Sequence, residues 1–160
     1  MASVSLTIAG GDNLAAKLAQ IAGKLGAGGS VNVGFLAGAP YPAKPGEPSL
    51  NVATVAFWNE FGTSNAPPRP FFRRMIAAKS PNWGKLVGAA VKKADYDVPQ
   101  TLGIVGEVIK GELRQSIVDL VSPPLAPYTI KKKGHDKPLI ETSLMLNSVD
   151  SEVTTGTPST

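Results

Sequence analysis

The stretch from residue 57 to residue 72 constrains the fold more than any other part of the chain. It reads FWNEFGTSNAPPRPFF, so one apolar segment ends at Gly62 and a second begins after a proline-stiffened link. Four of the chain's eight phenylalanines and tyrosines lie here, with one of its two tryptophans. A large aromatic side chain can bury about 150–250 Å². We therefore expect this elbow, residues 57–72, to lie in the protein core or in a contact between subunits.

The elbow holds no nucleophile paired with a base and no cluster of metal ligands, which favours a structural role. Its lone carboxylate, Glu60, is expected to accept hydrogen bonds from nearby backbone, or to pair with Arg69 or with a neighbouring subunit's arginine. The residues assigned to the core or to a subunit contact are Phe57, Trp58, Glu60, Phe61, Gly62, Pro68, Arg69, Pro70, Phe71 and Phe72.

Apolar spacing predicts an α+β fold, with a small mixed or antiparallel sheet packed against several helices. Alternation predicts strands at residues 4–8 and 31–35, either parallel neighbours or members of a mixed sheet, and a further strand at 151–155. Helical spacing predicts a helix over about 12–25, one capped by Asn51, one begun by Pro70, and one restarted at Ser80 and Pro81. A long helix capped by Asp97 follows to about residue 120, and a short helix or turn lies near 144–149.

The long helix contains Gly103, Gly106 and Gly111, each of which lowers helix propensity by about 1 kcal/mol relative to alanine. Such glycines let another backbone come close, for example from a second subunit, or they mark a kink or an early end of the helix.

Two proline-rich segments, residues 37–50 and 121–138, interrupt the helices. Proline disfavours helix in the residue before it, so we expect extended arms that lie on a neighbour, or surface loops. Only 18% of residues are charged, and a surface this poor in charge is often covered by neighbours. We assign residues 1–155 to a single assembly domain and residues 156–160 to a mobile tail.

Several functional classes are disfavoured. The chain has no cysteine, which removes disulfides and thiolate chemistry. We expect no signal peptide, because the first eleven residues have no basic region and no long apolar run, and no membrane span, because no apolar run is long enough. The glycines at 26–29 follow a helix instead of a strand, which is the wrong order for dinucleotide binding. Ser143, Glu60, Glu141 and the single histidine, His135, form no catalytic or metal-binding motif, so we expect no enzyme, cofactor or metal.

Basic residues cluster although the net charge is only +4. Seven lie between Arg69 and Lys93 without an acidic residue, and a second group surrounds residues 131–137. They indicate either contact with DNA or an acidic partner, or a solvated helix face and a lysine-rich loop. The alternative function is therefore nucleic-acid binding through the clusters at 69–93 and 131–137. The candidate partner-facing or DNA-facing residues are Arg73, Arg74, Lys79, Lys131, Lys132 and Lys133.

Three motifs in order resemble those of the neck and tail-completion proteins of tailed phages with long tails. The first comprises Asn59 to Thr63 and Pro68 to Phe72, and the second runs from Pro124 to Lys131. The third runs from Pro138 to Ser148 and departs from the family at Glu141, usually aspartate, and at Ser143, usually glycine. The resemblance covers residues 31–150. The residues assigned to the third motif are Leu139, Ile140, Glu141, Thr142, Leu144 and Ser148.

The resemblance implies a virion structural protein, assembled in the host cytoplasm, that forms a ring at the head-proximal end of the tail. Such a ring, sixfold like a tail tube, completes or terminates the tail and joins it to the head. Its implied partners are its own copies, the tail tube protein or tail terminator, head-closure or connector proteins, and the genome DNA that passes through the lumen. No membrane is implied.

Overall fold

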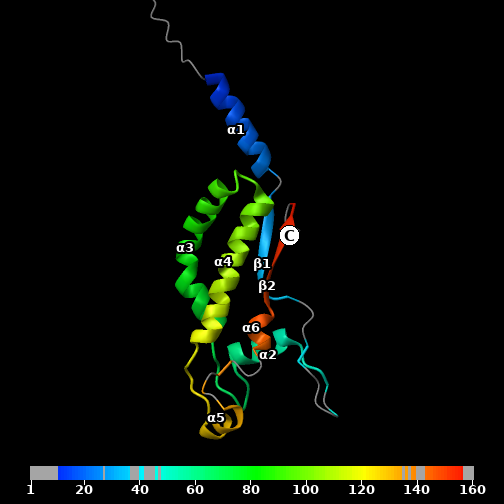
Figure 1. Cartoon of the computed structure of the whole chain (residues 1–160), viewed down its shortest axis with the longest axis vertical. Helices are drawn as coiled ribbons and strands as arrows, with labels where there is room; N and C mark the ends of the chain where they lie inside the picture. The colour runs from blue at the N-terminus through cyan, green and yellow to red at the C-terminus, as the bar shows by residue number, and fades with distance from the viewer. Residues whose placement is uncertain are drawn as a thin grey trace, which may run out of the picture.

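A computed structural model of the chain describes residues 11–26, 28–36, 40–41, 46, 48–134, 136, 138–139 and 143–156. Helix α4 (Val98–Asp119) forms the centre of the elongated body. Helix α3 (Phe71–Lys93) runs antiparallel along one side of α4, and a two-stranded sheet covers another side (Figure 1). Helices α2 (Val52–Phe61) and α6 (Leu144–Asn147) lie together near the lower end of the sheet.

The sheet joins the two halves of the sequence. Strand β1 (Gly29–Phe35) pairs antiparallel with β2 (Val149–Thr155), with Gly29 opposite Thr155 and Phe35 opposite Val149. The α+β fold class and the strands predicted at 31–35 and 151–155 are thus confirmed. The strand expected at residues 4–8 lies outside the described residues, and the described partner of β1 is β2.

The core forms where the apolar stripe of α4 meets α3, α2, α6 and the sheet. Asp97 and Asn51 cap α4 and α2, because Asp97 Oδ1 accepts from the Gln100 amide at 2.8 Å and Asn51 Oδ1 from the Ala53 amide at 2.8 Å. Both predicted caps are confirmed. The most deeply buried large side chains are Phe71, Leu113, Ile117, Val52 and Val149.

Gly106 allows the sheet to lie close against α4. A Cβ at this position would lie 2.8 Å from Val31 Cγ2 and 3.1 Å from Ser151 Cβ, so any larger residue would push the strands away. The prediction that a helical glycine admits another backbone is therefore confirmed at Gly106, and the approaching strands belong to the same chain. At Gly103 and Gly111 a Cβ would meet nothing within 4 Å.

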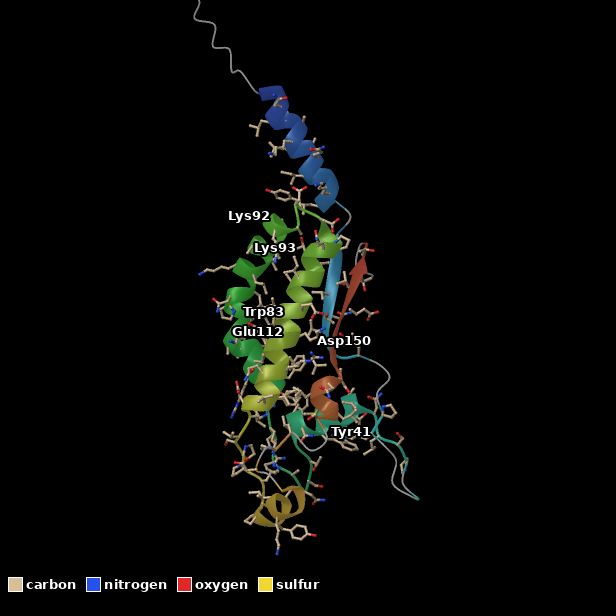
Figure 2. The ribbon with its side chains drawn as sticks, viewed as in Figure 1. Tyr41, Trp83, Lys92, Lys93, Glu112 and Asp150 are labelled. Carbon is tan, nitrogen blue, oxygen red and sulfur yellow. The ribbon has the colours of Figure 1, made fainter. Side chains whose placement is uncertain are left out.

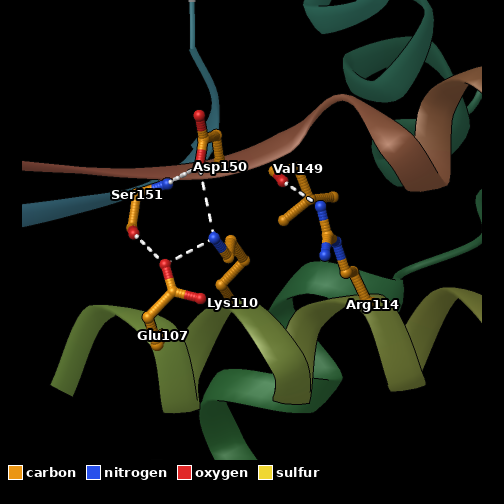
Figure 3. Close-up of polar contacts among 6 residues, drawn as sticks. All are labelled: Glu107, Lys110, Arg114, Val149, Asp150 and Ser151. Atoms are coloured by element: carbon orange, nitrogen blue, oxygen red, sulfur yellow. Dashed lines mark hydrogen bonds and ion pairs between the residues drawn. The ribbon is translucent and has the colours of Figure 1, made fainter. Parts of the chain in front are cut away.

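Polar contacts join the layers. Trp83 Nε1 donates to Glu112 Oε2 at 2.9 Å, which links α3 to α4 (Figure 2). Lys110 Nζ reaches Glu107 and Asp150, and an Arg114 guanidinium nitrogen donates to the Val149 carbonyl at 2.9 Å, which links α4 to β2 (Figure 3).

The titration of this second cluster follows from its hydrogen bonds. The bond from Lys110 lowers the pKa of Glu107, and bonds from the Ser151 amide and Lys110 lower that of Asp150. The two carboxylates in turn raise the pKa of Lys110, Glu107 most strongly. All three groups are therefore charged near neutral pH.

Two predicted boundaries are wrong. Residues 71–93 form one continuous helix with Pro81 inside it, instead of a helix that restarts at Ser80. Proline removes one helical hydrogen bond, but α3 packs along α4 and has buried residues on both sides of Pro81, Met75 and Ala90. The segment 121–138 is also not wholly extended, because Pro127 opens helix α5 (Pro127–Lys133).

In the segment predicted as an arm, residues 40 and 41 lie beside residues 49 to 51. The Tyr41 amide donates to the Leu50 carbonyl at 2.7 Å, and Pro40 and Asn51 form an isolated bridge. Ser49 Oγ also donates to the Tyr41 carbonyl, and Tyr41 packs against the core (Figure 2). The base of this arm is therefore fixed to the body.

Candidate interaction surface

The elbow turns sharply at Gly62. Its φ is +81° and its ψ is 175°, a conformation that residues with side chains rarely adopt. A Cβ here would lie 2.9 Å from the Ala66 carbonyl oxygen and 2.9 Å from the Pro68 nitrogen. The Gly62 amide donates to the Trp58 carbonyl at 2.8 Å, which ends α2. Glycine is thus required both by the backbone angle and by the space available.

Glu60 fixes α2 to the start of α3. This carboxylate is only 5% exposed and accepts from the amides of Phe72 at 2.9 Å and Arg73 at 3.1 Å. These are among the first amides of α3, which have no partner inside the helix and carry the positive end of its dipole. Arg73 Nε donates to Glu60 Oε1 at 2.8 Å, and another Arg73 nitrogen donates to the Glu60 carbonyl at 3.1 Å. The expected backbone acceptor role is confirmed, but the arginine of this chain that pairs with Glu60 is Arg73 instead of Arg69.

Three aromatic side chains of the elbow face solvent in this single chain. Phe57 is 58% exposed, Trp58 42% and Phe61 52%. The rings of Phe57 and Phe61 lie 4.7 Å apart, and the Arg73 guanidinium lies 4.7 Å over the Phe61 ring. Phe71 in contrast is fully buried, and Phe72 is half-buried. The prediction of core burial therefore holds for Phe71, and a subunit contact stays open for the three exposed rings.

An apolar pocket of about 220 Å³ lies beside these rings. It sits between α2, β1 and the first turn of α3. Glu60 and Arg73 are its polar members, and both are already bonded to each other. Such a pocket suits an apolar side chain better than a polar ligand. Its lining is Phe35, Ala53, Ala56, Phe57, Glu60, Phe61, Phe71, Phe72 and Arg73.

Arg69 belongs to the interior of the elbow. Its side chain is buried, and burial lowers the pKa of its guanidinium. Its amide donates to the Asn59 carbonyl at 2.6 Å, and its Nε has no hydrogen-bond partner within the described ranges. Pro68 is exposed, whereas Pro70 is half-buried and immediately precedes α3.

The exposed basic residues differ in their contacts. The Arg73 side chain is 56% exposed but is paired with Glu60, and Arg74, Lys79 and Lys131 are also exposed. The side chains of Lys132 and Lys133 lie outside what the structure describes. Arg74, Lys85 and Lys92 are separated by eleven and seven residues, a spacing that puts them on one face of α3. The alternative of nucleic-acid binding through the 69–93 and 131–137 clusters therefore depends on their exposed members and not on buried Arg69.

Helix α1 (Gly11–Leu25) is a second apolar surface, which the sequence did not reveal as such. The helix itself was predicted, but it projects beyond the α3–α4 turn instead of packing on the body (Figure 1). Leu14 is 61% exposed and Leu18 56%. Lys24 Nζ bonds the Asp95 carboxylate and donates to the Asp95 carbonyl at 3.0 Å.

The third sequence motif lies partly in the core. Leu139 and the neighbouring Met145 are buried, Leu144 is half-buried, and Ser148 Oγ donates to the Leu144 carbonyl at 2.7 Å. Ser143 has a φ of +57°, so it occupies a left-handed position that favours glycine. Ile140, Glu141 and Thr142 lie outside the described residues. The described part of this motif therefore supports packing.

Among the residues that the structure describes, no group of three or more His, Cys, Asp or Glu side chains could hold a metal ion. No helix of that same part is both long and apolar enough to cross a bilayer. Comparison with known proteins gave no match: no protein-family model, no curated protein and no solved structure corresponds to this chain.

Proposed function

We propose that this chain is a structural component of a tailed-phage virion, assembled in the host cytoplasm. It forms a ring, sixfold like the tail tube, at the head-proximal end of the tail. The ring completes or terminates the tail and joins it to head-closure or connector proteins, and the genome passes through its lumen. The three sequence motifs between residues 59 and 148 support the family, and the surface of the elbow supports a role in assembly.

The observation that carries the proposal is the exposure of Phe57, Trp58 and Phe61 on a rigid support. Large aromatic side chains are rarely left together at a solvated surface unless a partner covers them. Here Glu60 and Gly62 hold the backbone beneath them in one conformation. A surface that is already ordered loses little conformational entropy when it binds, which favours a tight contact.

Binding to tail tubes tests the proposal. The purified chain, mixed with tail tubes of the phage that encodes it, should cap one end and stop further polymerisation of the tube. Phe57→Ala with Trp58→Ala should abolish capping. Val87→Ala should not, although Val87 on α3 is also 39% exposed. Absence of the chain from purified virions, together with no binding to tubes or to a head-closure protein, would contradict the proposal.

A further inference from the structure

Helix α1 carries an apolar seam that the described part of the chain leaves largely exposed. Leu14, Leu18, Ile21 and Leu25 are spaced by four, three and four residues, the spacing of a helix that packs lengthwise on another helix. The three leucines are between 43% and 61% exposed. A fifteen-residue helix is marginal in water without tertiary packing. The seam therefore needs a partner.

A groove of about 490 Å³ between α3 and α4 offers a complementary shape. Its lining includes Ala78, Val108 and Gly111, where Val108 is 40% exposed and Gly111 leaves open space above the backbone. Small residues at this place allow a third helix to lie close to both α3 and α4. The α3 wall carries Arg74 and Lys79, and the α4 wall carries Glu112 and Asp119.

The charges of seam and groove match in sign and in spacing. Lys17 and Lys24 lie seven residues apart on one flank of the α1 seam, and Ala15 and Ala22 occupy the other flank. Glu112 and Asp119 are also seven residues apart, along the α4 wall. A docked helix would place its lysine flank beside the acidic α4 wall and its alanine flank beside the basic α3 wall. Flanking charges of this kind set the partner and the orientation of paired helices.

We infer that α1 of one copy lies in the α3–α4 groove of a second copy of this chain. Two α1 helices paired with each other would match lysine with alanine or with lysine, and Glu60, the acid in the lining of the elbow pocket, is already paired with Arg73. The contact of Lys24 with Asp95 holds α1 beyond the α3–α4 turn, away from the groove of its own chain (Figure 1). An ammonium has three donors, so Lys24 can keep Asp95 and also face a second carboxylate.

This contact joins two different surfaces, so each copy offers one helix and one groove. Repetition of such a contact closes into a ring when the rotation between copies divides a full turn. That the copies close into a ring depends on the proposed function. The contact between helix and groove does not, because it is argued from the residues of α1, α3 and α4.

Disulfide trapping tests the contact directly, because the chain has no cysteine of its own. Full-length Leu18→Cys and Val108→Cys chains, one carrying a size tag, should form mixed disulfide dimers when combined and oxidised. Gln20→Cys, on the opposite face of α1, is the matched control and should give at least tenfold less product. Equal yields from the two α1 positions, or a disulfide formed only within a doubly substituted chain, overturn the inference.

Assembly measured by sedimentation or native mass spectrometry gives a second test. Leu14→Ala with Leu18→Ala should weaken self-association by roughly 100-fold, whereas Asn13→Ala with Gln20→Ala should leave it unchanged. Lys17→Glu and Asp119→Lys should each weaken it by about three- to tenfold and restore it when combined. A wild-type chain that stays monomeric at millimolar concentration, or unchanged association of the leucine variant, overturns the inference.

The two proposals fail in different ways. If the leucine variant assembles and caps tail tubes like the wild type, the contact is wrong and the proposed function stands. If the disulfides form as expected but neither tubes nor virions contain the chain, the contact stands and the proposed function is wrong.

Discussion

The elbow and helix α1 both present large apolar side chains to solvent, but only the elbow is held in place. Buried Glu60 ties α2 to the first turn of α3, and Gly62 permits the tight turn between them. Helix α1 in contrast is joined to the body by an exposed ion pair between Lys24 and Asp95. The elbow is thus a surface formed during folding, whereas the α1 surface obtains its packing from association. Mutations in the elbow should therefore lower the stability of the single chain, whereas mutations in α1 should weaken its assembly.

The largest effect is expected for Gly62→Ala. The new Cβ would meet the Ala66 oxygen and the Pro68 nitrogen, and alanine disfavours this positive φ, so the free energy of unfolding should fall by roughly 2–4 kcal/mol. Urea denaturation measures the change. Gly84→Ala, in α3 with nothing within 4 Å, is the control and should raise stability by about 0.5–1 kcal/mol. If the two substitutions changed the free energy of unfolding equally, the turn at Gly62 would not be held in one conformation.

Glu60→Ala should lower the free energy of unfolding by about 2–3 kcal/mol, because two helix amides and Arg73 lose a buried acceptor. Glu60→Gln should lower the free energy of unfolding by less, since the oxygen of the glutamine amide can still accept from the backbone. Glu152→Gln, an exposed change on β2, serves as the control in the same denaturation experiment. If Glu60→Ala and Glu152→Gln unfold at the same urea concentration, Glu60 does not hold the elbow together.

Leu14→Ala with Leu18→Ala should change the free energy of unfolding by no more than about 0.5 kcal/mol at low protein concentration. Both side chains are mostly exposed in the single chain, so little buried area is lost. The stability of wild type and variant is compared by thermal unfolding at a series of protein concentrations. A large loss that persists at the lowest concentration would mean that α1 packs within its own chain, and the contrast with the elbow would disappear.

The smallest effect is a pH dependence of the link between α1 and the body. The hydrogen bond and charge of Lys24, with a smaller contribution from Lys17, lower the pKa of Asp95. The link is therefore fully present above the ordinary carboxyl pKa of about 4 and is lost as the pH falls through the lowered value. The distance between labels at Gln20→Cys and Lys92→Cys should become broader at low pH.

The Asp95→Asn substitution should produce the same broadening at pH 7, without acid, and Glu152→Gln should not. A label distance that stays narrow in the Asp95→Asn chain would show that α1 is held by contacts other than this ion pair.

The sequence predicted elements better than it predicted their partners. Periodicity located α2, α4 and both described strands, and Asn51, Asp97 and Gly62 marked their ends, because caps and turns depend on neighbouring residues. Pro81 was misleading, since packing on α4 keeps α3 continuous around it. The apolar stripe of α1 predicted a buried face, but such a stripe does not reveal whether the covering partner belongs to the same chain.

The same limit applied to the elbow. Its aromatic content and the backbone role of Glu60 could be predicted from local sequence. The choice of Arg73 over Arg69 could not, because it depends on the angle at which α3 leaves the turn. The groove between α3 and α4 was also invisible, since its two walls lie about thirty to forty residues apart in sequence.

The closed base of the arm at 37–50 has a practical consequence. Pro40 forms a bridge with Asn51, and the bonds that join Tyr41 to Leu50 and to Ser49 keep the two sides of the segment together. The entropy of closing a loop grows only slowly with its length. Foreign peptides or affinity tags inserted between Tyr41 and Ser49 should therefore leave the remainder of the molecule intact, which makes this segment a convenient handle for labelling assembled particles.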